Sequence, residues 1–189
     1  MACFVAAPLS GQVGLHVSAG ARYSATLVHD SIVSGFDVRP GIAPVLAVSA
    51  VLPGHRGWSG EATLDVSWST LSRHENGTTT SLGGLGAVSF AVGLRRQIIA
   101  ALGARVTAGG LKYLPANESG VFRGGAGEVY PVLGVAVDYR LPFGPGLTLD
   151  ARADAHQFST RALRDAGFVE RRMVPRVTLA VRADLGRLW

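Results

Sequence analysis

Between Gln12 and Leu27 the sequence alternates apolar and polar or small residues without a break. The apolar residues occupy the odd positions, beginning at Val13, and residues such as His16 and Arg22 occupy the even ones. Because successive side chains of a β-strand point to opposite faces, a period of two predicts a strand with one apolar and one polar face. The predicted strand is far longer than the usual length of about 5 to 6 residues.

The same alternation recurs along the chain. The well-defined segments are 12–27, 58–70, 128–141, 147–156 and 176–185. Three weaker segments, in which the second face is small rather than polar, are 39–52, 81–95 and 97–112. A buried helix over 88–108 is the competing interpretation, but its glycines and the basic pair Arg95 and Arg96 favour a hairpin turn. The sequence therefore predicts eight strands.

The connections between the predicted strands alternate in length. Long, polar or glycine-rich connections are expected near 28–38, 72–80, 113–127 and 158–172. Short connections are expected near 53–57, 95–97 and 142–146. All long loops then leave from one rim, and both termini lie at the other, as in bacterial outer-membrane barrels with short periplasmic turns and longer extracellular loops.

The chain is hydrophobic on average, with a mean hydropathy of +0.28. No segment approaches the roughly 20 consecutive apolar residues that a spanning helix needs. Apolar residues spread over every second position are instead typical of a membrane β-barrel. We therefore predict an all-β protein with a single eight-stranded antiparallel up-and-down transmembrane β-barrel.

The remaining composition excludes several kinds of site. The single cysteine, Cys3, excludes an internal disulfide and a cysteine-based metal site. The net charge of +5 comes from arginine, since Lys112 is the only lysine. A basic excess can indicate an anionic partner, but many arginines share strand faces with acids, so we predict no nucleic-acid partner. No P-loop, zinc spacing or dinucleotide fingerprint is present, and we predict no cofactor.

The apolar run at residues 2–9, followed by Ser10 and Gly11, resembles the end of a secretory signal peptide. The basic region that begins such a signal is missing, so the true start of translation is expected further upstream. A lipoprotein anchor at Cys3 is the alternative. We assign residues 1–12 to a residual signal-peptide-like segment and residues 13–189 to the barrel.

An apolar exterior requires the charged side chains to lie inside. Isolated charges in a narrow interior would be costly, and the nearly equal numbers of both signs predict a paired network. We expect it to include contacts between the two last strands, 147–156 and 176–185. The predicted members are Arg22, Glu61, Asp65, Arg105, Asp138, Arg140, Asp150, Arg152, Asp154, Arg176, Arg182 and Asp184. Water-soluble ligand barrels such as lipocalins invert this pattern and are the alternative fold.

Trp58 and Trp68 lie ten residues apart on one predicted strand, and therefore on one face. At about 3.3 Å per residue and a tilt near 40°, they are about 25 Å apart along the barrel axis, the height of an outer-membrane apolar band. We predict membrane-interface aromatics at Tyr23, Trp58, Trp68, Tyr139 and Trp189. Tyr113 and Phe143 are expected to extend these girdles.

Over residues 12–189 the chain resembles the small outer-membrane barrels of the OmpA, OmpX and OmpW kind. Its last residue, Trp189, follows apolar residues at alternate positions from Leu179 to Leu185, which is similar to the C-terminal signal read by the barrel-assembly machinery. Arg187 departs from that pattern. The resemblance implies an integral protein of the bacterial outer membrane, with membrane lipid, lipopolysaccharide and the assembly machinery as partners.

Candidate catalytic residues are few. His16 and Ser18 share the predicted interior face, whereas His29, Asp30 and Ser31 are adjacent in a loop, where they cannot form a triad. His156 and Ser159 resemble the pair of outer-membrane lipid A deacylases, but their spacing of three residues differs from the spacing of two in that family. We predict a structural or loop-displaying surface protein without catalysis, the alternatives being a small channel and a lipid-modifying enzyme. The ligand of the loops is not predicted.

Overall fold

The computed structural model describes residues 12–30, 35–118, 120–123, 128–143, 146–167 and 172–188. Their strands form one antiparallel sheet. The strands are β1 (Val13–Ser24), β2 (Val28–Asp30), β3 (Phe36–Pro40), β4 (Ala43–Pro53), β5 (Trp58–Glu75), β6 (Thr78–Ile99), β7 (Leu102–Pro115), β8 (Val129–Arg140), β9 (Leu147–Phe158) and β10 (Arg172–Leu188).

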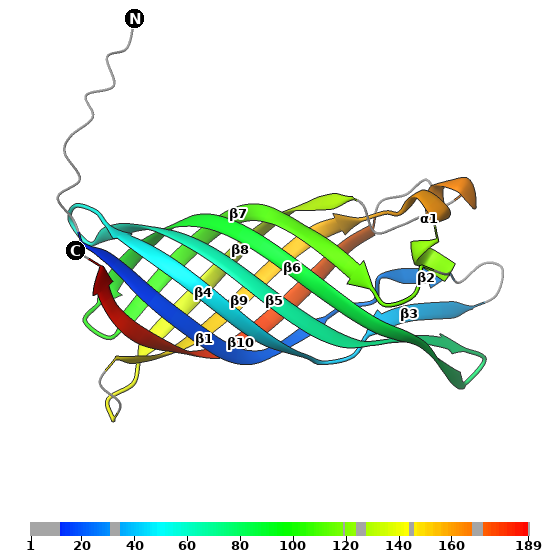
Figure 1. The fold of residues 1–189 in the computed structure, drawn as a ribbon, viewed down its shortest axis with the longest axis horizontal. Coiled ribbons are helices and arrows are strands. Elements are labelled where there is room, and N and C mark those ends of the chain that lie inside the picture. Colours follow the sequence, from blue (N-terminus) through cyan, green and yellow to red (C-terminus); the bar gives the residue numbers. More distant parts are fainter. Residues whose placement is uncertain are drawn as a thin grey trace, which may run out of the picture.

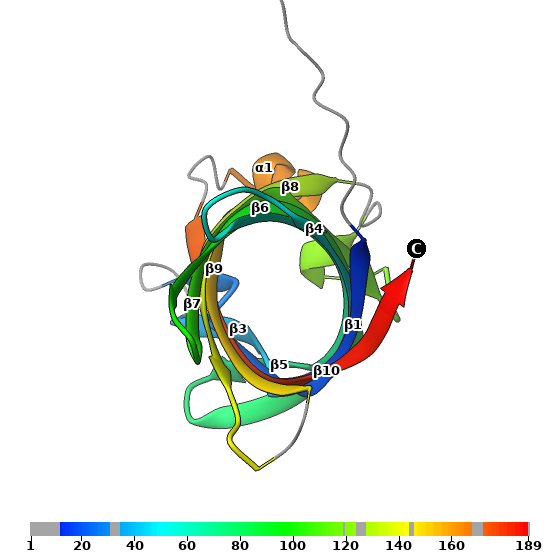
Figure 2. The same cartoon turned by 90° about the vertical axis from the view of Figure 1, so that its left-hand side faces the viewer.

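Eight of these strands close into a barrel. Strand β1 pairs with both β4 and β10, and β5 pairs with β6, so the order β1-β4-β5-β6-β7-β8-β9-β10 returns to its beginning. Figure 1 shows the barrel from the side, and Figure 2 shows the closed ring from the end that carries the termini. The predicted all-β, eight-stranded antiparallel barrel is confirmed.

The alternation of the sequence decides which side of the wall each residue occupies. On β8 the odd positions, such as Leu133, Val135 and Val137, are exposed on the outside, and the even positions, such as Ala136 and Asp138, are buried inside. The other strands of the ring repeat the arrangement, and the large apolar side chains exposed on the described residues lie mostly on the outer face. An apolar outer face of this extent is typical of a barrel that lies in a membrane.

The turn expected at residues 95–97 is wrong. Strand β6 continues through Arg95 and Arg96 to Ile99, and the turn lies at Ala100 and Ala101. Both arginines keep the alternation of the strand: Arg95 points inward, and Arg96 lies over the ring of Trp58 on the outer face, 5.2 Å from its centroid. A pair of adjacent arginines therefore fits a strand of the barrel when one of them pairs with a carboxylate inside the lumen and the other lies over an aromatic ring on the outer face.

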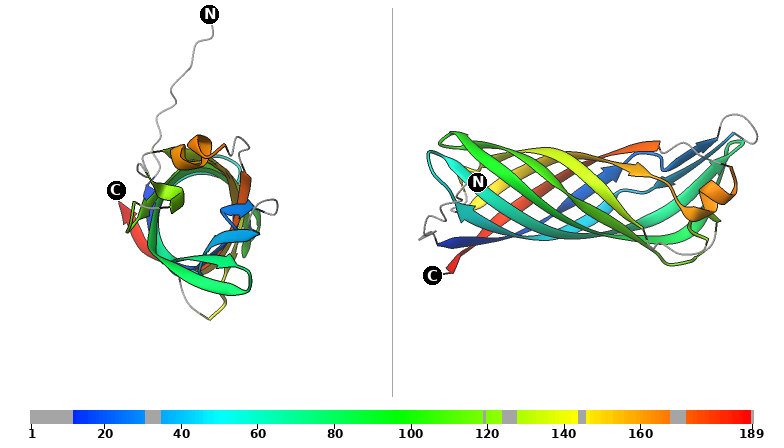
Figure 3. Two further views of the ribbon diagram at one scale, coloured as in Figure 1. Left: turned by 90° about the vertical axis from the view of Figure 1, so that its right-hand side faces the viewer. Right: turned by 90° about the horizontal axis from the view of Figure 1, so that it is seen from above.

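Two of the long connections expected from the sequence are largely strand in the structure. Strands β5 and β6 remain paired as far as Glu75 and Thr78. The long loop expected at 72–80 is therefore reduced to a hairpin turn of two residues, Asn76 and Gly77. Asn76 and Gly77 both have positive φ angles, of 48° and 77°, as a type I′ turn requires. Within the expected loop at 28–38, β2 and β3 form a hairpin that pairs with this extension of β5. Figure 3 shows these strands projecting beyond the ring.

Two short helices complete the loop end, α1 (Arg161–Asp165) and the 3-10 helix η1 (Gly120–Phe122). Thr160 caps α1 by accepting a hydrogen bond from the Leu163 backbone at 3.3 Å. In the described part of the chain, no helix is long and apolar enough to cross a membrane. Of the segment assigned to a signal peptide, residues 1–11 lie outside the described residues.

Placing a charge on the outer face should destabilise the barrel. Val135 is exposed at mid-length of β8, so Val135→Arg should lower the free energy of unfolding in phospholipid vesicles by about 2–4 kcal/mol, measured by urea titration. Val135→Leu is the control and should be nearly neutral. Equal stability of the two variants would show that this face does not contact lipid.

Candidate functional site in the barrel lumen

The inner face carries three layers of side chains between the end with the termini and the end with the long loops. Two layers are clusters of charged residues, and the third, at the loop end, is apolar and aromatic. The first charge cluster, nearer the termini, comprises Glu61, Arg95, Arg105, Asp138, Asp150 and Arg182. The second charge cluster comprises Arg22, Asp65, Arg152, Asp154 and Arg176.

In the first charge cluster every cation has a carboxylate partner. Arg105 donates to Glu61 and Asp150, at 2.5 Å each. Arg182 donates to the same two carboxylates, at 2.7 and 3.0 Å. These four residues come from β5, β7, β9 and β10, so the ion pairs cross the lumen and hold the wall from opposite sides. Truncating one partner of such a pair leaves a buried charge uncompensated.

Arg95 also belongs to this cluster, although the sequence predicts a turn at this position. Its Nε and Nη2 atoms donate to the two carboxylate oxygens of Asp138, at 2.9 and 2.5 Å. A Cβ atom at Gly103 would lie 2.6 Å from Arg95 Nη2 and 2.8 Å from Asp138 Oδ1. Glycine at this position therefore makes room for a two-pronged arginine–carboxylate contact.

The second charge cluster is built around Asp65. Arg22 Nη1 donates to one of its oxygens at 2.9 Å, and Arg152 Nη2 donates to the other at 2.7 Å. Asp154 accepts a hydrogen bond from Arg176 Nε at 2.5 Å and lies 3.4 Å from Arg152 Nε. Contacts between the last two strands of the ring, β9 and β10, are present at Asp154–Arg176 and at Asp150–Arg182.

Two of the residues predicted for the network lie elsewhere. Arg140 and Asp184 are on inner faces by register, but both are exposed at the rim near the termini, and neither forms an ion pair with the described residues. Both lie at the open rim, since Arg140 is the last residue of β8 and the pairing of β10 with β9 stops at Ala183, just before Asp184. The other ten predicted residues belong to the two charge clusters, which also contain Arg95.

The third layer closes the lumen at the loop end. Its buried members include Tyr113, Tyr130, His156 and Phe158 from the wall, and Phe122 from η1. Ring centroids within this group lie 5.5 to 6.0 Å apart. We call it the aromatic plug. The expectation that Tyr113 joins the outer girdle is wrong, because its position on β7 points inward and its hydroxyl contacts His156 Nε2 at 3.0 Å.

Loop segments are tied over the aromatic plug. Tyr130 donates to the carbonyl oxygen of Ser159 at 2.9 Å, and Thr160 donates to the carbonyl oxygen of Val121 at 2.5 Å. Leu27 packs into the same apolar group from the connection after β1. Figure 3 shows η1, α1 and β2 gathered around this end of the barrel. The loops and the wall thus share one small apolar core, which blocks the lumen.

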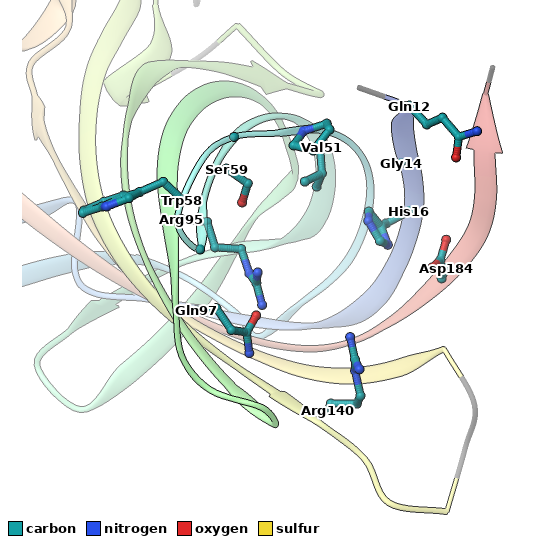
Figure 4. Close-up of a pocket in the computed structure, with 13 residues that line it drawn as sticks. Gln12, Gly14, His16, Val51, Trp58, Ser59, Arg95, Gln97, Arg140 and Asp184 are labelled. Carbon is teal, nitrogen blue, oxygen red and sulfur yellow. The ribbon is translucent and has the colours of Figure 1, made fainter. Parts of the chain in front are cut away.

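The opposite end is open to solvent. A cavity of about 620 Å³ lies at the rim near the termini. Figure 4 shows its polar lining, which includes His16, Ser59, Arg95, Gln97, Arg140 and Asp184. The cavity ends at the first charge cluster, so the lumen is a vestibule at this end and is filled beyond it.

The candidate catalytic residues are not assembled into a reactive group. His16 and Ser18 are half-buried on β1, and no hydrogen bond joins them in the described structure. His156 is buried in the aromatic plug, whereas the Ser159 hydroxyl accepts a hydrogen bond from Arg164 at 3.4 Å. Ser31 lies outside the described residues. Among the residues described, no group of three or more His, Cys, Asp or Glu side chains could hold a metal ion.

The predicted interface aromatics that the structure describes face outward. These are Tyr23, Trp58, Trp68 and Tyr139, all of them exposed. Trp58 begins β5 near the termini, and Trp68 lies toward the loop end of the same strand. Trp189 lies outside the described residues.

Removing one carboxylate from the first charge cluster should destabilise the barrel strongly. Glu61→Gln leaves Arg105 and Arg182 with Asp150 as their only carboxylate, which should cost about 3–5 kcal/mol because both cations stay buried. The variant should lose its fast-migrating folded gel band at a lower temperature than the parent. Glu75→Gln, which removes an exposed ion pair with Arg73, should leave that temperature unchanged. Similar temperatures for both variants would contradict a structural role for the cluster.

The fold can be compared with known proteins. No protein-family model matches the chain, and no curated protein matches its sequence. Ail, the attachment invasion locus protein of Yersinia pestis, solved with the heparin analogue sucrose octasulfate, is 11% identical over 92% of this chain and 97% of its own, with a TM-score of 0.52. The backbone structure of Ail in a phospholipid bilayer nanodisc is 13% identical over 93% of this chain and 100% of that chain, with a TM-score of 0.50. The chain therefore has the fold of the small bacterial outer-membrane β-barrels of the OmpA, OmpX and Ail kind.

Proposed function

We propose that the protein is a structural, loop-displaying protein of the bacterial outer-membrane surface, and that it binds an extended segment of a partner protein along the projecting edge of β6. The observation that carries the proposal is the unpaired edge at Thr78–Gly83. The blocked lumen supports it, because a filled barrel leaves its ends as the surfaces able to contact another molecule.

The projecting part is a sheet of strands β2, β3, β5 and β6. Phe36 of β3 pairs with Glu75 of β5, and the guanidinium of Arg73 lies 4.6 Å from the centroid of the Phe36 ring. His29 and Arg39 contact the Asp37 carboxylate at 2.5 and 3.0 Å. The hydrogen bond with His29 is the main reason that the pKa of Asp37 lies below its ordinary value. These contacts hold the sheet together outside the membrane.

One edge of this sheet is free in the described structure. Pairing of β6 with β7 begins at Leu85 and Pro115, so Thr78–Ser81 and Gly83 pair with β5 on one side alone, and Leu82 lies at an irregularity in that pairing. In a two-residue hairpin the two residues that flank the turn, here Glu75 and Thr78, are hydrogen-bonded to each other. Along an antiparallel pair, hydrogen-bonded and non-hydrogen-bonded positions alternate, so the N–H groups of Thr79 and Ser81 point away from β5. Thr78–Ser81 are exposed and uncharged, without the lysine or proline that commonly protects an edge. Such an edge suits an added strand.

Membrane lipid and the assembly machinery are the other partners that we propose. The exposed outer face requires acyl chains around it, and the girdle aromatics suit the two interfaces. Lys112 is exposed on the outer face of β7, two residues from Leu114. Leu114 pairs with Gly86 of β6, and Gly86 pairs with Trp68 of β5, so Lys112 lies near the interface that Trp68 marks. Its ammonium group is suited to a lipopolysaccharide phosphate at that interface. The C-terminal residues that end in Trp189 would serve the barrel-assembly machinery as a signal.

The channel and the lipid-modifying enzyme are the remaining alternatives. Two charge clusters and the aromatic plug stand across the lumen, which argues against conduction. Steady single-channel currents in a planar bilayer would favour the channel. A change in the mass of lipid A extracted from producing cells would favour the enzyme.

The hairpin tip should be accessible on intact cells. In a Cys3→Ser background, Asn76→Cys should react with a membrane-impermeant maleimide, because Asn76 lies at the exposed turn between β5 and β6. His55→Cys, in the exposed short turn at the other end, should react only after the cells are broken. Labelling of His55→Cys alone on intact cells would reverse the proposed orientation.

Blocking the outward N–H of the edge should prevent strand addition. A dye-labelled eight-residue peptide of alternating Thr and Val should bind the purified protein in nanodiscs saturably, measured by fluorescence polarisation. Thr79→Pro should abolish this binding, because proline has no N–H to donate. Thr79→Val is the matched control, since it loses the contact with His74 but keeps the N–H. Equal binding by both variants would contradict the edge as the binding surface.

A further inference from the structure

The cavity at the rim near the termini is lined by charged side chains of both signs that no opposite charge balances. Arg140 ends β8 and Asp184 lies near the end of β10, and neither forms an ion pair with the described residues. Both are exposed at the wall of a space of about 620 Å³, which is large enough for a small organic molecule. The first charge cluster, which forms the floor, is itself balanced, with three arginines and three carboxylates.

The positive side of the cavity is formed by Arg95 and Arg140. Asp138 accepts hydrogen bonds from the Nε and Nη2 atoms of Arg95, so Nη1 has no hydrogen-bond partner among the described residues. The Arg95 side chain is 20% exposed, and this exposed surface borders the cavity. Arg140 follows Asp138 by two residues on the same inner face of β8. Two guanidinium groups thus flank a single carboxylate, and their remaining N–H groups suit the carboxylate of a ligand.

The negative side is formed by Asp184, which a β-bulge holds in place. The register of β1 and β10 shifts between Leu15 and His16, so that Leu185 is the extra residue and Asp184 pairs with His16. Figure 4 shows these two side chains on neighbouring strands of the rim. Gly186 has a positive φ angle of 106°, and its N–H donates to Asp184 Oδ1 at 2.8 Å. Bulges commonly redirect a side chain at the rim of a barrel. The second oxygen, Oδ2, remains available to an ammonium group.

The balance of charge decides which kind of ligand fits. Arg95 and Asp138 neutralise each other, so Arg140 and Asp184 leave the cavity with no net charge. A multivalent anion would be repelled by Asp184, and a multivalent cation by Arg140. A small zwitterion instead places its carboxylate on the arginine side and its ammonium on the aspartate side. Both contacts are then charge-assisted hydrogen bonds, and the occupied cavity stays neutral.

We propose that this cavity binds a small zwitterion with one free ammonium and one free carboxylate, of the size of an amino acid or a dipeptide. Arg95 and Arg140 hold the carboxylate, and Asp184 holds the ammonium. The first charge cluster and the aromatic plug fill the lumen beyond the cavity, so the ligand enters and leaves by the same mouth. In the orientation proposed above, that mouth faces the periplasm. The site is independent of the proposed surface function, because it lies at the opposite end from the β6 edge.

The site is tested with probes that differ only in their charged ends. Alanine has both ends, N-acetylalanine has the carboxylate alone, and alanine amide has the ammonium alone. Each is titrated at neutral pH into the isotope-labelled complete chain in nanodiscs, and binding is followed by the amide resonances of Gly14, which lines the cavity, and Gly186. Alanine should shift these resonances saturably. Each single-ended probe should bind more weakly by about tenfold or more, because one charge-assisted contact is lost.

Dialanine, titrated in the same way, tests the longer ligand. Saturable shifts with alanine or dialanine support the proposal, and the tighter of the two gives the separation of the charged ends. Absence of saturable shifts with both, or equal binding of all four probes, would overturn the proposal.

Matched variants should change the preference among the probes. Asp184→Asn keeps an oxygen for the Gly186 N–H but leaves the cavity positive, so it should weaken alanine about tenfold or more and spare N-acetylalanine. Arg140→Gln should weaken alanine similarly and spare alanine amide. Arg56→Gln removes an exposed arginine at the same end that does not line the cavity, and should change nothing.

The variants should fold as the parent does, because neither Arg140 nor Asp184 has an ion-pair partner among the described residues. An unchanged temperature for the loss of the fast-migrating gel band checks this. Alanine binding that survives both Asp184→Asn and Arg140→Gln, or that Arg56→Gln reduces equally, would contradict the assignment.

Discussion

The structure depends on a sheet that has no edge within the membrane. In lipid every backbone N–H and C=O group must find a partner inside the protein, and a closed ring of strands provides one for each. The pairing of β1 with β10 completes the ring here. Because each strand is then exposed to lipid on one face and to the lumen on the other, its sequence must alternate. The length of the alternating segments follows from the thickness of the layer they cross.

The filled lumen is the second consequence of this closure. An eight-stranded ring is just wide enough for side chains to occupy its interior. The chain fills it with arginines that reach across to carboxylates on distant strands, as Arg105 reaches Glu61 and Arg152 reaches Asp65. Glycine opposite some of these groups, as at Gly103, provides the necessary space. Ion pairs of this kind hold opposite walls together, but they also exclude wide passage through the barrel.

Beyond the membrane the constraint is relaxed, and the strands diverge from the ring. Strands β5 and β6 continue past the end of β7, and β2 and β3 attach to them. Backbone groups there can be satisfied by water, so an unpaired edge at Thr78–Gly83 is tolerated. The aromatic plug lies at the boundary between these regions. Phe122 and Leu27 from the loops meet Tyr113 and Phe158 from the wall, which couples loop position to the barrel.

The sequence by itself determined the eight strands, the two faces of each and the charged lumen, because a period of two requires no knowledge of which strand is the neighbour. The sequence misplaced the turn near Arg95, because a basic pair can occur in a turn or within a strand. It also placed Tyr113 on the wrong face of the barrel wall, because the local pattern around a single aromatic residue is the same on the outer and the inner face. It also missed Arg95 as a lumen residue and counted Arg140 and Asp184 as network members. Only the tertiary structure decided which charges meet: Arg22 and Asp65 are 43 residues apart, and they come together because the closed sheet brings the inner faces of its strands around one narrow axis.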